Sequence, residues 1–200
     1  MTPAPIQTQI ESLLRALVNE FIFYPADLEI SVNRFTTILN VSWRGNRADT
    51  SRMIGERGAT WAALHNLLEL IGEQHGLTVD LERVGDPKVG KVERYEGFKA
   101  NADWPRARII GLIKRAAESA VRAGNPVEVS SGNLGATKTG IEIAIAANEN
   151  MRTESVLRAS LSHIFKVIGN RHGRELIVTV RRSLESERQP ETASGRFVKI

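Results

Sequence analysis

The chain has no cysteine among its 200 residues. This absence excludes disulfide bonds, thiolate zinc sites, iron–sulfur clusters and cysteine nucleophiles, and it agrees with a reducing cytoplasm, the compartment we expect. No apolar run approaches the roughly 20 residues that span a bilayer. The segment Met1–Pro5 has neither the basic nor the apolar block of a secretory signal. We therefore expect a globular protein that has no membrane as a partner.

Neither sign of charge is in large excess, because 27 Lys and Arg face 23 Asp and Glu. The distribution is uneven, however. Residues 1–90 hold 8 basic and 11 acidic side chains, residues 91–182 hold 16 and 9, and the last 18 residues hold 3 of each. A basic second half attracts polyanions through long-range attraction and counterion release. Charges scattered for solubility explain the same numbers equally well, so charge alone does not decide the function.

A short segment of sequence occurs twice, at an offset of 97 residues. Ile71–Gly76 is Ile-Gly-Glu-Gln-His-Gly, and Ile168–Gly173 is Ile-Gly-Asn-Arg-His-Gly. Each copy ends a stretch of helical periodicity and precedes the alternating apolar residues of a strand. Both halves also share the order helix, strand, strand, helical stretch, strand, which indicates an internal duplication. We interpret His75 and His172 as helix C-terminal caps, where the dipole favours a partly protonated ring.

The duplication sets the predicted divisions of the chain. A first unit covers residues 1–85, a linker 86–103, a second unit 104–182 and a flexible tail 183–200. Apolar residues make up 42 %, charged residues 25 % and aromatic residues 6 %, which is ordinary for globular units. The linker interleaves cations with aromatics, which either stack bases of a single strand or hold the two units together; these residues are Lys91, Arg94, Tyr95, Phe98 and Lys99.

A loop with two glycines precedes the strongest helical pattern of the first half. Residues 55–58 are Gly-Glu-Arg-Gly, and a helix with a leucine-rich apolar stripe follows at once. Glycine tolerates positive φ and has no β-carbon, so such a loop lets another backbone approach closely. The amides of the loop and of the helix start, together with the helix dipole, favour a negatively charged guest. A phosphodiester backbone is the natural candidate.

The arrangement resembles a prokaryotic-type (type II) KH domain, which has a Gly-x-x-Gly loop between its two consecutive helices. Residues 53–60 are similar to the loop of the small bacterial KhpA-like KH proteins. The resemblance covers residues 6–84 well and residues 104–182 only through architecture and the repeated hexapeptide. It implies an α+β fold of two tandem KH-like αββααβ units, each a three-stranded mixed sheet packed on helices, with a degenerate second unit. The implied elements of the first unit are residues 6–21, 27–33, 36–43, 48–54, 59–73 and 77–84.

In KH domains the loop clamps the backbone of about four nucleotides, while the bases lie along an adjacent apolar groove. Carried over to this sequence, Gly55 and Gly58 permit the approach of the backbone, Arg57 faces phosphate and Ile54 lines the groove. The full set of RNA-binding residues that the resemblance implies is Arg47, Arg52, Ile54, Gly55, Glu56, Arg57, Gly58 and His65.

Three residues depart from the KH pattern. Glu56 places an anion in a loop that should meet phosphates, and Ala59 and Ala62 stand where KH relatives often have basic side chains. Residues 44–58 nevertheless hold four arginines against two acidic residues, a local charge of +2. We expect weak, salt-sensitive binding of single strands by this unit. The alternative is a KH-shaped unit that has lost RNA binding.

The second half lacks the glycine loop. At the offset of 97 residues, the loop corresponds to Arg152-Thr153-Glu154-Ser155. Without glycines this segment does not admit another backbone, and we interpret Thr153 as the N-cap of the following helix. Arg152 and Arg158 are the auxiliary phosphate contacts that we expect from this half. Such contacts strengthen binding without specifying sequence.

No signal for catalysis or for a metal is found. The four histidines have no second ligand at a recurring metal-site spacing, so no metal is proposed. A Walker loop, a nucleophile elbow and a dinucleotide fingerprint are all absent, so we expect no enzyme and no cofactor. The sequence thus predicts a cytoplasmic, bacterial RNA-binding protein whose partner is single-stranded RNA, by family analogy a ribosome-associated or small RNA. The alternatives are single-stranded DNA as the ligand, or a scaffold for a protein partner or homodimer.

Overall fold

The computed structural model describes residues 5–84 and 104–182. The first stretch has the order αββααβ with two short 3-10 turns, and its six long elements begin and end within two residues of the predicted bounds. They are α1 (Ile6–Asn19), η1 (Pro25–Asp27), β1 (Glu29–Phe35), β2 (Ile38–Arg44), α2 (Arg47–Ile54), η2 (Glu56–Gly58), α3 (Ala59–Glu73) and β3 (Thr78–Arg83).

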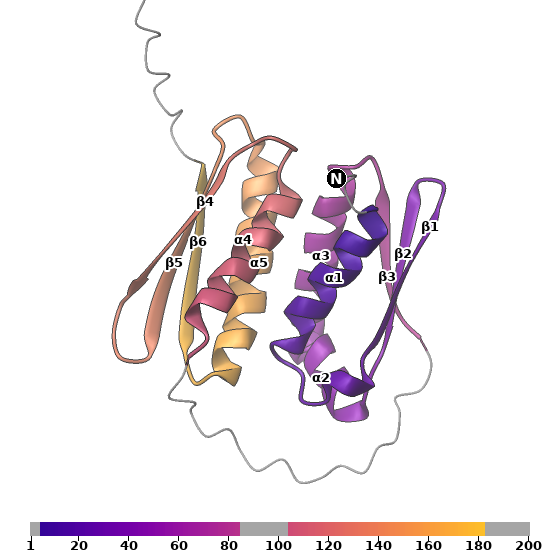
Figure 1. Cartoon of the computed structure of the whole chain (residues 1–200), viewed down its shortest axis with the longest axis horizontal. Coiled ribbons are helices and arrows are strands. Elements are labelled where there is room, and N and C mark those ends of the chain that lie inside the picture. Colours follow the sequence, from indigo (N-terminus) through magenta and orange to yellow (C-terminus); the bar gives the residue numbers. More distant parts are fainter. Residues whose placement is uncertain (1–4, 85–103, 183–200) are drawn as a thin grey trace, which may run out of the picture.

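The sheet of the first unit has β2 at its centre, antiparallel to β1 and parallel to β3. Alternate residues of β2 are buried, namely Leu39, Val41 and Trp43. This period of two places one face of the sheet against α1 and α3, as Figure 1 shows. The opposite face has only polar or half-exposed side chains along β2, such as Asn40 and Ser42. Because only one face of the sheet is apolar, one layer of helices, α1 and α3, is enough to cover it.

The second unit repeats this sheet but not every helix. Its elements are α4 (Arg106–Ala120), β4 (Val127–Asn133), β5 (Lys138–Ile145), α5 (Met151–Arg171) and β6 (Glu175–Arg182). The central strand β5 is antiparallel to β4 and parallel to β6. The predicted α+β class, with two three-stranded mixed sheets packed on helices, is confirmed. The order of the second unit is αββαβ rather than αββααβ, because β5 runs to Ile145 and a turn leads directly into the single 21-residue helix α5, so that α2 has no helical counterpart.

The repeated hexapeptide has a packing role in both units. A Cβ added at Gly72 would lie 2.8 Å from the carbonyl oxygen of Leu77, and one at Gly169 would lie 2.5 Å from that of Arg174. In each unit a helix therefore passes so close to the next strand that only glycine fits. Gly76 and Gly173 then turn the chain with positive φ, at 67° and 62°. The hexapeptide is the helix-to-strand corner of the fold.

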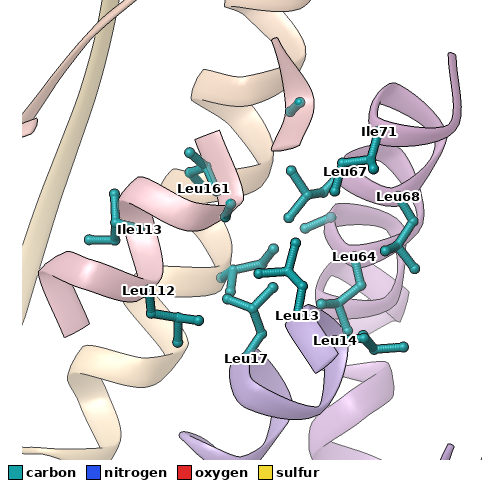
Figure 2. Close-up of a cluster of buried hydrophobic side chains, with 14 of the residues drawn as sticks. Leu13, Leu14, Leu17, Leu64, Leu67, Leu68, Ile71, Leu112, Ile113 and Leu161 are labelled. Carbon is teal, nitrogen blue, oxygen red and sulfur yellow. The ribbon is translucent and has the colours of Figure 1, made fainter. Parts of the chain in front are cut away.

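The two units pack against each other through their helices. Figure 1 shows the two sheets on the outside and the helices of both units between them, with α1 and α3 facing α4 and α5. Leucines from all four helices meet at this junction in Figure 2, and the buried residues of both units form one continuous hydrophobic cluster. The units thus share a core.

Equivalent helices lie antiparallel across the junction. The end of α1 meets the start of α4, since Glu20 pairs with Arg108 at 3.0 Å. The end of α3 meets the start of α5, since Glu73 pairs with Arg152 at 2.7 Å. Contacts between like elements that run in opposite directions are those of an isologous dimer. The two units therefore pack against each other like the subunits of a symmetric dimer, within one chain.

The predicted linker, residues 86–103, and the predicted tail, residues 183–200, lie outside the described residues, as do the aromatic and basic side chains named in the linker. None of the described helices has the length and apolarity needed to cross a lipid bilayer. Within the same residues, no three His, Asp or Glu side chains are grouped so that they would hold a metal ion.

Candidate nucleic-acid interface

The glycine loop begins where α2 ends, and buried polar groups fix α2 in place. The Asn46 side chain caps the helix by accepting a hydrogen bond from the Ala48 amide at 3.0 Å. Asp49 is buried, and its carboxylate accepts hydrogen bonds from the amides of Phe23 and Tyr24 at 2.7 and 2.8 Å. These bonds tie α2 to the segment that follows α1. The short helix is therefore a rigid support for the loop.

Both loop glycines have backbone conformations that favour glycine. Gly55 has φ 73° and ψ 177°, a region that is essentially restricted to glycine. A Cβ there would lie 2.2 Å from the Thr60 hydroxyl oxygen and 2.9 Å from the Thr60 amide nitrogen. Gly55 is thus required by the close approach of the start of α3.

Gly58 is different because it faces open space. Its φ of 82° is left-handed, but a Cβ added there would meet nothing within 4 Å. Gly58 is also the N-cap of α3 and provides no side chain to bond the first amides of that helix. Arg57, between the glycines, has an exposed side chain and a left-handed backbone with φ 51° and ψ 27°. The loop therefore presents bare backbone to solvent at a helix N-terminus.

The arginines around the loop have different environments. Arg47 is exposed at the first residue of α2. Arg52 is half-buried, with its guanidinium 3.6 Å from the centre of the Phe23 ring. Because Asp49 is buried and hydrogen-bonded, Glu56 is the one exposed carboxylate of residues 44–58. The surface beside the loop is therefore more basic than the local count of +2 suggests.

The other two predicted site residues, Ile54 and His65, lie at different distances along the chain from the loop. Ile54, the last residue of α2, has 37 % of its side-chain surface exposed next to the loop. His65 lies in α3, beyond the first turn, and its ring is 4.0 Å from Glu69. The residues 47, 52 and 54–58 are thus brought together by α2 and the loop, whereas His65 lies further along α3 beside a carboxylate.

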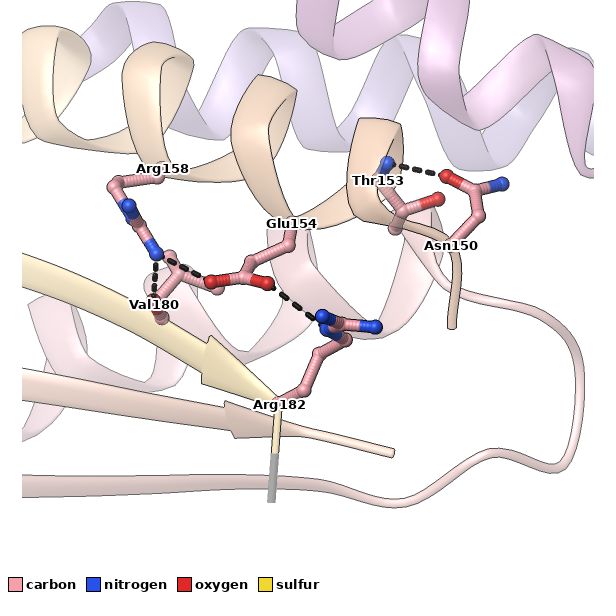
Figure 3. Close-up of polar contacts among 6 residues, drawn as sticks. All are labelled: Asn150, Thr153, Glu154, Arg158, Val180 and Arg182. Atoms are coloured by element: carbon pink, nitrogen blue, oxygen red, sulfur yellow. Dashed lines mark hydrogen bonds and ion pairs between the residues drawn. The ribbon is translucent and has the colours of Figure 1, made fainter. Parts of the chain in front are cut away.

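The equivalent segment of the second unit is the first turn of a continuous helix. Asn150 is the N-cap of α5, and its side chain accepts a hydrogen bond from the Thr153 amide at 2.6 Å (Figure 3). The prediction that Thr153 is the N-cap is wrong. Thr153 lies within the first turn and is buried. An ordinary capped helix leaves no opening for a second backbone in this unit.

The two auxiliary arginines are engaged elsewhere. Arg152 pairs with Glu73 at the end of α3, about 20 Å along that helix from the glycine loop at 1.5 Å per residue. Arg158 pairs with Glu154 and donates to the Val180 carbonyl at 3.0 Å, as Figure 3 shows. Antiparallel packing therefore carries Arg152 away from the loop, and the contacts of Arg158 hold it against β6.

A contact between the units lies directly behind the loop. The hydroxyl of Thr60, the residue that Gly55 packs against, is 3.1 Å from Nε2 of His163 in α5. Burial, and next the positive charge of Lys166, lower the pKa of His163, so the ring favours its neutral form. Neither Thr60 nor His163 was among the predicted site residues. No local pattern in the sequence identifies this pair, because it exists only when the units dock.

His172 occupies a second contact between the units. Its ring lies 3.4 Å from a Glu20 carboxylate oxygen and packs edge-on against Trp104, at 5.4 Å between ring centres. Burial lowers the pKa of His172, although the hydrogen bond and charge of Glu20 oppose the shift. The residue does cap α5, but its ring favours the neutral form, contrary to the partly protonated cap that we expected.

The pocket beside His172 has a volume of about 850 Å³ and lies between α1, α4 and the end of α5. Its polar lining includes Glu20, Arg108, Arg115 and Arg171. A second pocket of about 530 Å³ lies at the other end of the groove between α1 and α4. Both pockets lie away from the glycine loop, so they are separate from the interface described above.

The fold and the loop together define a protein of two α+β units, one of which leaves Gly58 open to solvent at the N-terminus of α3. Compared with models of known protein families and with curated proteins, the chain matches none of them.

Proposed function

We propose that this protein binds single-stranded RNA, with the loop of residues 55–58 as the clamp for the sugar–phosphate backbone. The observation that carries the proposal is the bare backbone at Gly58, which faces open space at the N-terminus of α3. The Gly58 and Ala59 amides donate to the carbonyls of Gly55 and Glu56, so what this position offers a strand is the positive end of the α3 dipole and a backbone without a side chain, which lets a second backbone come close. The αββααβ order, with this loop between consecutive helices, supports the likeness to a type II KH domain.

The surroundings of the loop suit a phosphate-bearing strand more than a protein surface. Arg47, Arg57 and the stacked Arg52 supply positive charge, and the half-exposed Ile54 offers an apolar edge for a base. Contacts of this kind are made mainly to the phosphates of the RNA. We therefore expect binding that depends on salt and has little sequence specificity.

The experiment compares one charge change at two equivalent positions. Gly58→Asp adds a carboxylate to the open face of the loop, where a side chain has room and where Asp tolerates left-handed φ. Ser155→Asp adds the same charge at the equivalent position of α5, where Ser155 is exposed. Binding of a short, fluorescently labelled single-stranded RNA is measured by anisotropy, with thermal melts to verify folding.

We expect Gly58→Asp to raise the Kd by at least about tenfold, equivalent to about 1.4 kcal/mol, and Ser155→Asp to leave it within about twofold. Equal effects of the two variants would show that only overall charge matters and would contradict the clamp. Binding of a protein partner that survives Gly58→Asp, in a protein that ignores RNA, would favour the scaffold alternative. Competition with single-stranded DNA of the same sequence separates the two nucleic acids.

A further inference from the structure

We infer that the RNA-binding surface extends from the glycine loop onto the second unit, at the carboxyl-terminal half of α5, where Lys166 contacts a phosphate. This inference rests on the proposed function. It assigns a role to a residue that neither the sequence pattern nor the KH resemblance indicates.

The packing of the helices brings α5 to the loop. Thr60 lies in the first turn of α3 and touches both the loop, at Gly55, and α5, at His163. Gly55, Thr60 and His163 are therefore consecutive neighbours across the junction of the units. His163 acts as a positioning residue, because its 3.1 Å contact fixes the register of α5 against the start of α3.

The direction of α5 then places Lys166. The helices α3 and α5 run antiparallel. Residues of α5 that follow His163 therefore lie beyond the start of α3, on the side where the loop is. Lys166 is three residues after His163, about one turn or 4.5 Å further along the axis and on the same side of the helix. The helix geometry therefore places Lys166 on the loop side of the contact between Thr60 and His163.

Lys166 is also available for a ligand. Its side chain is exposed, and within residues 5–84 and 104–182 no carboxylate lies within ion-pair distance of it. This contrasts with Arg152 and Arg158, whose guanidinium groups pair with Glu73 and Glu154. An exposed ammonium without a carboxylate partner, next to a basic loop, extends the path that a strand follows after it leaves Gly58.

The experiment compares two lysines of the second unit in the full chain. Lys166→Ala removes the proposed contact, and Lys114→Ala removes an exposed lysine of α4 that pairs with Glu118 at 3.7 Å. Anisotropy with single-stranded RNA is recorded over a series of salt concentrations, because each phosphate contact contributes about 0.7 to the slope of log K against log salt. Gly58→Asp is measured alongside.

We expect Lys166→Ala to raise the Kd about three- to tenfold and to reduce the magnitude of the slope by about 0.7, whereas Lys114→Ala changes neither. Lys166→Arg should restore both values. If Lys166→Ala matches the wild type, or weakens binding without changing the slope, while Gly58→Asp abolishes binding, then the surface ends at the loop and this inference is wrong, but the proposed function stands. If Gly58→Asp has no effect, the clamp itself is wrong.

Discussion

The first unit joins its central strand to its long helix through the short helix α2 and a loop with two glycines, whereas the second unit passes from β5 through a turn into the single helix α5. The sheets of the two units have the same topology, and the same glycines shape the corner from helix to strand. The difference lies in the segment between the central strand and the long helix, which is α2 with the loop of residues 55–58 in the first unit and a turn with the start of α5 in the second. In the first unit the loop exposes backbone at Gly58, and in the second unit Asn150 caps the helix and closes it.

This difference places the bare backbone of the glycine loop in one unit only, while both units use the same packing scheme. Both copies retain the residues that their shared core needs, namely the apolar faces of the helices and the corner glycines. The equivalent residues, 152–155, form the first turn of α5, in which Thr153 is buried and Arg152 pairs with Glu73 of the first unit. The second unit completes the core and, as we propose, adds Lys166 to the interface of the first.

The largest effect on stability should arise at Gly55. Gly55→Ala places a Cβ 2.2 Å from the Thr60 hydroxyl oxygen in a backbone region that only glycine adopts readily. We expect a loss of about 3 kcal/mol in the free energy of unfolding, measured by chemical denaturation. Arg152→Ala, at the equivalent position, should cost less than about 1 kcal/mol, because it loses only an exposed ion pair. Equal losses would mean that the two segments do not differ as described.

Intermediate losses of stability should arise at the helix-to-strand corners, of which each unit has one. The Cβ of Gly72→Ala would lie 2.8 Å from the carbonyl oxygen of Leu77, and the Cβ of Gly169→Ala would lie 2.5 Å from that of Arg174. Both carbonyls belong to the segment that leads into the next strand. Overpacking of this kind costs about 2 kcal/mol, and we expect similar losses from both variants in denaturant titrations. A loss at only one of the two positions would argue against equivalent corners.

A smaller effect should appear with pH, at the contact of His172 with Glu20 and Trp104. Because burial lowers the pKa of His172 in the folded protein, the unfolded chain takes up the proton first as the pH falls below the ordinary value of 6.5. Stability should therefore decrease from about pH 7 toward the lowered pKa. Thermal melts should show this decrease for the wild type and a flatter profile for His172→Gln. His75→Gln, at the exposed equivalent position, is the control and should keep the wild-type profile.

Much of the fold could be predicted because its signals are local. The period of two in Leu39, Val41 and Trp43 and the helical stripe of α3 each follow from burial of one face. The loop was predictable for the same reason, since two glycines before a strong helix have few structural interpretations. The N-cap of α5 was missed because Asn150 and Thr153 are both good caps, and only the backbone decides which of them flanks the helix.

The sequence by itself determined two α+β units, the order of helices and strands along the first of them, and the one loop that leaves backbone bare, because each of these depends on the spacing of apolar residues and glycines along a short segment. Only the tertiary structure decided that the units share a core, that Arg152 lies at the far end of α3 from the loop, and that His163 contacts Thr60 behind the loop. Those facts depend on the direction in which one helix packs on another. Antiparallel and parallel packing of α3 and α5 bury similar apolar faces, so no pattern of residues along the chain distinguishes them.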